Sequence, residues 1–438
     1  MNEIISKLII YGDLPKDCIL MELAGICAQV KSQDYNKDIL ITRIYKQIKK
    51  ILVIATDYGF DDNLWQNYLT YLLITDENPF SITCEKTGAQ NGSVNHFAKN
   101  DFKAFMDLFH YDFSYLEKAL DIDCFSTLSD YHAIGKPELM YNKNVSEKVQ
   151  ALSKKLANAN NEDEFFESVT GFYKDYGVGM FGLNKAFRIG NVDEFGHITF
   201  QAINNMDKVM LDDLIGYEIQ KKKLVDNTKA FVEGKKANNC LLFGDSGTGK
   251  STSIKAIVNQ FYDQGLRMIE IYKHQFKDLS NVIAQIKNRN YKFIIYMDDL
   301  SFEDFEIEYK YLKAVIEGGL EKKPKNVLIY ATSNRRHLVR EKFSDKEERR
   351  DDLHAGDTVQ EKLSLVSRFG VTIFFAAPDK KEFQNIVRVL AERYGVKLPE
   401  EELLLEANKW ELAHGGLSGR TAQQFIDYLL GRKESTCQ

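Results

Sequence analysis

The sequence predicts an α/β fold in which a parallel sheet follows a mainly helical N-terminal region, residues 1–200, and precedes a small helical segment. Three observations lead to this fold class. Apolar residues recur at helical spacing in the first region, short apolar runs alternate with helical stretches in the second half, and helical spacing returns after Pro378. Strands that alternate with helices along a chain are typical of a parallel sheet.

The N-terminal region carries apolar side chains at spacings of three and four, as at Ile44 and Ile48. This spacing places them on one face of a helix, so we interpret them, and the aromatic residues with the same spacing, as helix packing. Glycines become frequent between residues 177 and 196, and a short β-like run follows at residues 198–200. We therefore expect a domain boundary near residue 200 and assign no chemistry to the region before it.

The composition argues against several classes of protein, among them membrane-spanning and secreted proteins. The formal net charge of −6 gives no overall attraction to nucleic acid, and no run approaches the roughly 18 apolar residues of a membrane span. The N-terminus lacks the pattern of a signal peptide. The six cysteines are scattered and form no C-x-x-C pair, which argues against a zinc site or a redox couple. We expect a soluble cytoplasmic protein with reduced thiols.

Five apolar runs in the second half predict the strands of the sheet. Each run is short and is separated from the next by a helical stretch. Pro378 follows the fifth run, and helical spacing then resumes at Phe383, Ile386 and Leu390. The five runs cover residues 240–243, 266–272, 293–297, 327–332 and 371–376.

The segment at residues 244–251, GDSGTGKS, fits the phosphate-loop pattern G-x-x-x-x-G-K-[ST] and directly follows a predicted strand. Glycines let the backbone turn its N–H groups toward phosphate oxygens, and the helix that begins near Thr252 adds a favourable dipole. Lys250 supplies a positive charge to the β- and γ-phosphates, and the Ser251 hydroxyl is suited to Mg²⁺. The sequence therefore predicts ATP and Mg²⁺ as ligands. The expected nucleotide-binding residues here are Gly244, Asp245, Ser246, Gly247, Thr248, Gly249, Lys250, Ser251 and Thr252.

Two carboxylates, Asp298 and Asp299, come directly after the apolar run at residues 293–297. Ligands of parallel sheets bind at the carboxyl ends of the strands, so both side chains are expected beside the phosphates. We expect Asp298 to hold Mg²⁺ through water, and Asp299 to orient or deprotonate the attacking water. Glu303 is a second candidate for this base.

The order of these motifs over roughly residues 207–435 resembles the AAA+ ATPase superfamily. The resemblance implies a nucleotide-binding core over residues 207–377 and a helical lid over residues 378–438. It also implies that several subunits assemble head to tail. The segment LDDLIGYE looks like the part of this superfamily that packs against adenine, which makes Ile215 and Gly216 candidate base contacts.

The same resemblance assigns roles to three more polar residues. Asn334, in ATSNR, would hold the attacking water, and Arg368, in SRFG, would reach the γ-phosphate of a neighbouring subunit. Arg420, in LSGRT, would contact the nucleotide from the lid. Together with GTGKS and DDLSFE, these motifs most resemble an uncharacterised bacterial AAA+ family that is known mainly as a domain of unknown function. The resemblance therefore implies an ATPase core and no physiological substrate.

Three interpretations of function stay open. The first is an oligomeric ATPase that remodels an unknown macromolecular partner, which the N-terminal region recognises. The second is a switch that binds ATP and hardly hydrolyses it, because Asp299 is shorter than the glutamate of most relatives. The third is a DNA-associated ATPase of the helicase-loader or branch-migration kind. Lysine clusters at residues 221–223 and 235–236 suggest it, although solvated helix faces explain them more simply.

Two further segments bear on the partner. The short connection at residues 272–277 lacks the loop of unfoldases that thread polypeptides, so threading is not favoured. The strongly charged segment at residues 341–362 is interpreted as a solvated loop, with a partner-binding insertion as the alternative.

Overall fold

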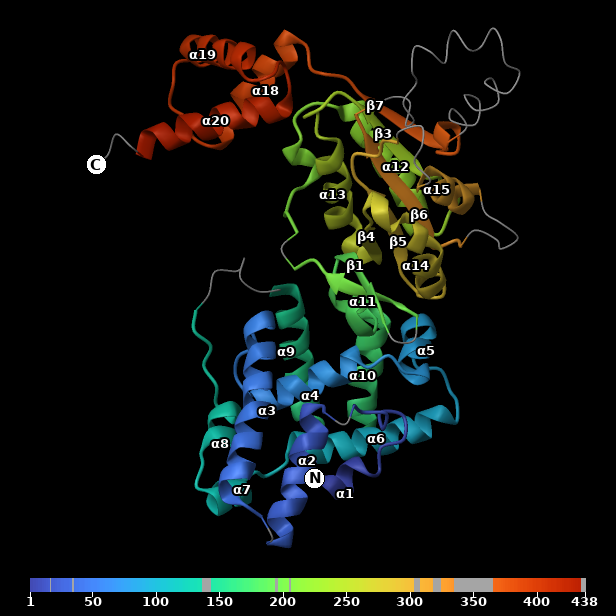
Figure 1. The fold of residues 1–438 in the computed structure, drawn as a ribbon, viewed down its shortest axis with the longest axis vertical. Helices are drawn as coiled ribbons and strands as arrows, with labels where there is room; N and C mark the ends of the chain where they lie inside the picture. The colour runs from blue at the N-terminus through green and yellow to red at the C-terminus, as the bar shows by residue number, and fades with distance from the viewer. Residues whose placement is uncertain are drawn as a thin grey trace. The chain divides into compact units, whose positions relative to one another are not determined.

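The protein, seen in a computed structural model, divides into two compact units. The first comprises Met1–Asn184 with Ile203–Asn205, and the second comprises Lys185–Ala202 with Met206–Gln438. Helices build the first unit, and the second contains the sheet (Figure 1). The structure describes residues 1–15, 17–33, 35–135, 143–193, 196–204, 206–302, 308–317, 324–334 and 365–434. None of the helices in these ranges has the length and apolar character needed to cross a lipid bilayer.

Several helices of the first unit begin at a residue whose side chain caps them. The Asn161 side chain accepts hydrogen bonds from the N–H groups of Asp163, at 3.0 Å, and Glu164, at 2.9 Å, which starts α10. Gly177 follows the last residue of that helix. The helices are α1 (Asn2–Ile5), α2 (Ile19–Ser32), α3 (Lys37–Tyr58), α4 (Leu64–Thr75), α5 (Pro79–Thr87), α6 (Val94–Phe109), α7 (Ser114–Leu120), α8 (Cys124–Ser129), α9 (Lys143–Ala157), α10 (Glu162–Tyr176) and α11 (Gly179–Leu183).

Aromatic side chains at helical spacing fill the core of the first unit. Phe102, Phe105 and Phe109 project from α6 and are almost completely buried. The ring of Phe102 lies 5.5 Å from that of Phe165 on α10, and Phe109 meets the same ring edge to face at 5.6 Å. These aromatic residues therefore pack helix against helix, as their spacing predicts.

A buried carboxylate fixes the chain before α2 onto α6. Asp101 is fully buried, and its oxygens accept hydrogen bonds from three consecutive backbone N–H groups. Those of Ile9 and Tyr11 lie at 3.0 Å, and that of Ile10 lies at 2.7 Å. A carboxylate that accepts several N–H groups makes stronger hydrogen bonds than a neutral acceptor.

Asp101→Ala is expected to lower the free energy of unfolding by about 3 kcal/mol or more, because each N–H left unpaired costs about 1–3 kcal/mol. Urea denaturation followed by fluorescence measures this loss. The chain has two tryptophans, so in a Trp410→Phe background Trp65 reports on the first unit alone. Asp107→Ala removes an exposed carboxylate from the same helix and should change stability by no more than about 0.5 kcal/mol. A loss at Asp101 as small as that at Asp107 would contradict the role.

The sheet of the second unit has seven strands in the order β2-β1-β4-β5-β6-β3-β7. Every neighbouring pair is parallel except β1 and β2, which are antiparallel. The strand before the phosphate loop, β3, lies between β6 and β7, and β7 forms one edge. The strands are β1 (Ala186–Val192), β2 (Ile198–Ala202), β3 (Cys240–Gly244), β4 (Leu266–Glu270), β5 (Lys292–Met297), β6 (Val327–Ser333) and β7 (Val371–Phe375).

Each of the five expected strands is present, but the expected number of strands is wrong. β1 and β2 extend the sheet, because β1 pairs in parallel with β4 through Ala186, Phe187 and Arg188. The same pairing moves the division between the units to Asn184, earlier than the expected residue 200.

Helices cover the sheet, and three more follow it. Those around the sheet are α12 (Glu218–Val232), α13 (Lys250–Phe261), α14 (Leu279–Ile286) and α15 (Glu308–Glu317), with short 3₁₀ turns η2 (Leu211–Asp213), η3 (Tyr262–Gln264) and η4 (Lys273–Asp278). The C-terminal helices α18 (Lys380–Arg393), α19 (Glu400–Ala413) and α20 (Gly419–Glu434) enclose a small apolar core of their own that includes Phe383, Val387, Phe425 and Ile426. We call these three helices the lid.

Candidate functional site

The phosphate-loop segment lies between β3 and α13, where the sequence predicts it. Gly244 and Gly249 have φ angles of 133° and 91°, in the region that favours glycine. A Cβ at Gly244 would lie 2.1 Å from the Phe375 carbonyl oxygen, and one at Gly249 would lie 2.3 Å from Leu214. These close contacts therefore leave no room for a side chain at either glycine of the loop.

Lys250 begins α13 and is nearly buried, with 6% of its surface exposed. Its Nζ donates hydrogen bonds to the carbonyl oxygens of Gly244, at 3.0 Å, and Asp245, at 2.5 Å. Burial lowers the pKa of this lysine, although the carboxylates of Asp245, Asp299 and Asp298 oppose the shift. The ammonium group is thus held at the loop by backbone oxygens and surrounded by negative charge.

Ser251 and Asp298 meet at the carboxyl end of the sheet. The Ser251 hydroxyl donates to Asp298 Oδ1 at 2.7 Å, and the Thr332 hydroxyl donates to the same oxygen at 2.5 Å. Partial burial opposes ionisation of Asp298, but the hydrogen bonds from Thr332 and Ser251 outweigh it and lower the pKa of this carboxyl. Asp298 is therefore poised as an anion beside the hydroxyl of the phosphate loop.

This pair fits a magnesium ion bound together with a nucleotide. Both side chains offer oxygen, the donor that hard cations prefer. Among the residues that the structure describes, no three His, Cys, Asp or Glu side chains form a metal cage. Mg²⁺ is typically bound by one or two protein oxygens together with substrate phosphates and water, so Ser251 and Asp298 match its ordinary demands.

Asp299 and Asn334 also lie together. Asn334 Nδ2 donates to Asp299 Oδ1 at 2.8 Å. The backbone of Asp299 has a φ of 48°, a left-handed conformation that Asp and Asn tolerate better than most residues. The side chain expected to hold the attacking water is thus bonded to the side chain expected to activate it.

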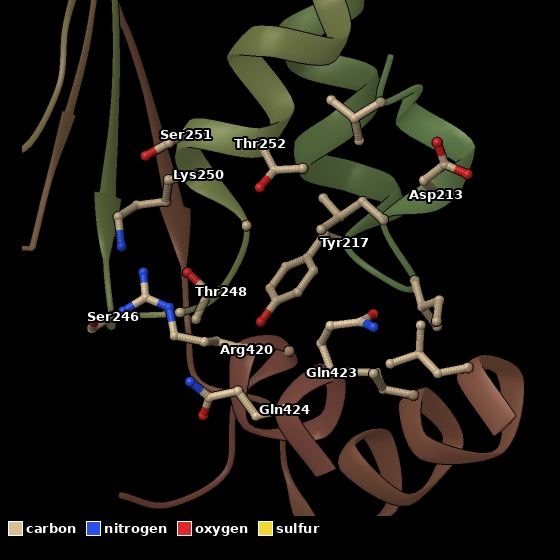
Figure 2. A pocket seen from close by; sticks show the side chains of 18 of the residues that line it. Asp213, Tyr217, Ser246, Thr248, Lys250, Ser251, Thr252, Arg420, Gln423 and Gln424 are labelled. Carbon is tan, nitrogen blue, oxygen red and sulfur yellow. The ribbon is translucent and has the colours of Figure 1, made fainter. Parts of the chain in front are cut away.

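The lid reaches the phosphate loop through α20. The backbone N–H of Arg420 donates to the Gly247 carbonyl at 3.2 Å. The Arg420 side chain extends toward Ser246 and Lys250, and Gln423 and Gln424 lie on the same helix (Figure 2). Arg420 therefore brings a second positive charge to the loop beside Lys250.

A second contact ties the lid to the segment before α12. Arg393, the last residue of α18, donates to the carbonyl oxygens of Asp213, at 3.1 Å, and Asp212, at 3.2 Å. The Arg393 guanidinium also lies 3.6 Å from the Asp213 carboxylate. The lid is thus attached at the phosphate loop and at η2.

These elements enclose one pocket of about 840 Å³, which is large enough for a nucleotide. Of the residues predicted from the sequence, twelve line it. They are Ile215, Ser246, Gly247, Thr248, Gly249, Lys250, Ser251, Thr252, Asp298, Asp299, Asn334 and Arg420.

Four predicted residues lie outside the pocket lining. Gly244 and Gly216 have positive φ angles of 133° and 79°, which glycine adopts readily. The Asp245 carboxylate turns away and accepts the Ala377 N–H at 2.7 Å, which joins the loop to the chain after β7. Arg368 precedes β7 at the edge of the sheet. Glu303 and the charged segment at residues 341–362 lie outside the described residues.

The sequence analysis missed several residues that line the pocket. Tyr217 points into it and donates from its hydroxyl to the Ala376 carbonyl at 2.8 Å (Figure 2). Thr332 precedes Asn334 by two residues, so the alternation of a strand could have indicated it. Gln423 and Gln424 follow Arg420 by three and four residues, the spacing that puts side chains on one face of a helix.

The chain resembles a family without an assigned function. A profile of the family described as "Protein of unknown function (DUF815)" matches residues 184–433, which begins one residue before the second compact unit. No curated protein matches the chain.

Solved structures with similar folds include two from Thermotoga maritima. A mutant of RuvB from that organism is 18% identical, with a TM-score of 0.36 over 51% of this chain and 67% of its own. The RuvB Holliday junction branch migration motor is 15% identical, with a TM-score of 0.32 over 51% and 72%. The FIGL-1 AAA domain in complex with ADP is 16% identical, with a TM-score of 0.35 over 52% and 75%. These values are too low to transfer any activity to this chain.

Proposed function

The chain belongs to the DUF815 family, and from that premise we propose that it is an oligomeric AAA+ ATPase that binds and hydrolyses ATP with Mg²⁺. One observation carries the proposal. A single pocket is lined by the phosphate loop, the acidic pair, Asn334 and the lid arginine. The parallel pairing of β6 with both β3 and β5 supports the same proposal, because it brings the phosphate loop after β3 and the acidic pair after β5 to the same carboxyl edge of the sheet.

The residues of the pocket suit the steps of phosphoryl transfer to water. The N–H groups of the loop and Lys250 bind the β- and γ-phosphates, and Ser251 and Asp298 hold the metal ion. When bound, Mg²⁺ supplies positive charge that neutralises the phosphate oxygens. Asp299 then accepts a proton from the attacking water at its carboxylate, while Asn334 keeps that carboxylate oriented.

In this proposal, the lid moves in response to the state of the bound nucleotide. Arg420 approaches the phosphate loop, and Arg393 holds η2, so a change at the γ-phosphate alters the contacts that fix the lid. We infer that this movement remodels a macromolecular partner, with the first unit as the part that recognises it. Arg368 completes the site of a neighbouring subunit in this proposal.

Lys250→Ala is expected to weaken ATP binding by about 100-fold or more. The variant loses the Lys250 ammonium group, whose charge-assisted hydrogen bonding and Coulomb attraction to phosphate together contribute about 3 kcal/mol. Isothermal titration with ATP and Mg²⁺ measures the affinity. Lys255→Ala is the matched control, because this lysine lies on the same helix, is partly exposed, does not line the pocket and pairs with Asp207 at 3.1 Å. Near-normal ATP affinity in a folded Lys250→Ala protein would overturn the proposed site.

A switch that binds ATP but hardly hydrolyses it is the second candidate. The contact between Asn334 and Asp299 favours it, because the amide occupies one of the acceptor sites of the carboxylate that water would otherwise use. A turnover assay on the purified protein separates the two. Tight ATP binding with no phosphate release under any assembly condition would select the switch.

The DNA-associated alternative has little support from the lysine clusters. Lys221 pairs with Glu218 at 2.7 Å and donates to the Leu214 carbonyl at 2.9 Å, with only 11% of its side chain exposed. Lys235 pairs with Glu233 at 2.6 Å. The buried contacts of Lys221 take it out of any patch that could bind phosphates of DNA, and the Glu233 carboxylate offsets the charge of Lys235, whose side chain is 70% exposed.

A further inference from the structure

A threonine at the end of β6 contacts both members of the acidic pair. Thr332 lines the pocket with only 2% of its surface exposed. Its hydroxyl donates to Asp298 Oδ1 at 2.5 Å and accepts the backbone N–H of Asp299 at 2.9 Å. One hydroxyl group therefore uses its donor and its acceptor capacity on two consecutive residues.

The backbone of Thr332 strengthens this connection. Its carbonyl accepts the N–H of Leu300 at 2.7 Å, so Thr332 holds three consecutive residues at the end of β5. Asp299, the middle residue, has the left-handed φ of 48°. Such a conformation persists only where surrounding contacts fix it, and the Thr332 hydroxyl makes one of those contacts at the Asp299 N–H.

Asn334 extends the same arrangement. Thr332 and Asn334 are two residues apart at the end of one strand, so their side chains lie on the same face. The first holds the Asp298 carboxylate and the Asp299 backbone, and the second holds the Asp299 carboxylate. Together they connect β6 to both carboxylates through side-chain hydrogen bonds.

We propose that Thr332 is a positioning residue for the reaction, which fixes Asp298 for the metal ion and Asp299 for water through one hydroxyl. The proposal rests on the ATPase function proposed above. Valine has nearly the same shape as threonine but no hydroxyl, so Thr332→Val removes the two hydrogen bonds and leaves the volume unchanged. Serine keeps the hydroxyl and loses one methyl group.

Thr332→Val is expected to weaken Mn²⁺ binding to the ADP complex by about 10-fold and to lower kcat by about 10- to 100-fold, the usual effect of losing a partner of a metal ligand. Electron paramagnetic resonance of Mn²⁺ gives the first value without any turnover. ATP affinity measured in EDTA should stay within about 2-fold of the normal value, because the phosphate loop and Lys250 are unchanged. A loss of Mn²⁺ affinity and kcat with unchanged ATP affinity distinguishes a positioning role from a general loss of structure.

Two variants control the experiment. Thr332→Ser should recover most of the Mn²⁺ affinity and kcat. Thr228→Val is matched, because Thr228 is fully buried in the same unit and its hydroxyl bonds to the Leu224 carbonyl and the Tyr330 hydroxyl, both at 2.8 Å, with none of these residues in the pocket lining. Wild-type Mn²⁺ affinity and kcat in Thr332→Val, or an equal loss in Thr228→Val, would overturn the role. A wild-type protein that binds no ATP would instead overturn the ATPase proposal.

Discussion

Arg368→Ala is expected to lower ATP turnover by about 10³- to 10⁵-fold while ATP binding stays intact. The arginine precedes β7, the edge strand, and is not among the residues that line the pocket of its own subunit. In the proposed assembly, this guanidinium reaches the nucleotide of an adjacent copy. A planar, permanently charged fork is suited to meet two γ-phosphate oxygens as charge rearranges in the transition state.

Mixing two inactive variants tests whether the arginine acts between subunits. Arg368→Ala keeps an intact nucleotide pocket, and Lys250→Ala keeps an intact arginine, so neighbours of the two kinds combine one of each. Phosphate release by the mixture should exceed the sum of the separate proteins and should rise with protein concentration. Arg388→Ala, which removes an exposed arginine paired with Glu400 at 2.6 Å, should keep normal turnover. A mixture without recovered activity, or full turnover by dilute monomers, would contradict the assembly.

Asp299→Asn is expected to reduce phosphate release by about 10²- to 10⁴-fold and to leave binding of ATP with Mg²⁺ unchanged. Asparagine tolerates the φ of 48° as well as aspartate does, and its amide oxygen can still accept from Asn334. The substitution therefore removes the proposed base without straining the backbone. Steady-state phosphate release and Mg²⁺-ATP titration on the same preparation measure the two effects.

Asp299→Glu is the informative companion variant. Glutamate restores a base but fits the left-handed conformation less well, so we expect turnover well above that of Asp299→Asn. If Asp299→Asn hydrolysed ATP at the normal rate, another carboxylate, such as Glu303, would have to be the base.

The elements that local pattern determines were predictable from the sequence. The apolar runs predicted β3 to β7, and the glycines with Lys250 and Ser251 predicted the phosphate loop that follows β3. β1 was missed because its outer half carries Gly190 and Asn191, which interrupt the alternation of a strand. β1 forms because its backbone pairs with β4, a distant segment, although its own sequence lacks a clear strand pattern.

Some individual contacts within the site were not predictable, because they join segments that are distant in the sequence. Thr332 and Asp298 are separated by 34 residues, and Arg393 and Asp213 by 180. No periodicity within either segment indicates that these groups meet. Tyr217 stands directly after a predicted base contact, but only the fold turns its ring into the pocket.

The pairing of β1 with β4 has a consequence for shortened forms of the protein. In the sheet order, β1 pairs with one edge of β4, and β2 pairs with the other edge of β1. The residues of β4 are almost all buried. A chain trimmed to start after residue 200 keeps the phosphate loop but leaves β4 with a row of unpaired N–H and carbonyl groups. Apolar strands exposed in this way template aggregation between copies. A chain trimmed to start at Lys185 retains β1 and β2, so β4 keeps its hydrogen-bonded neighbour and does not become an exposed edge strand.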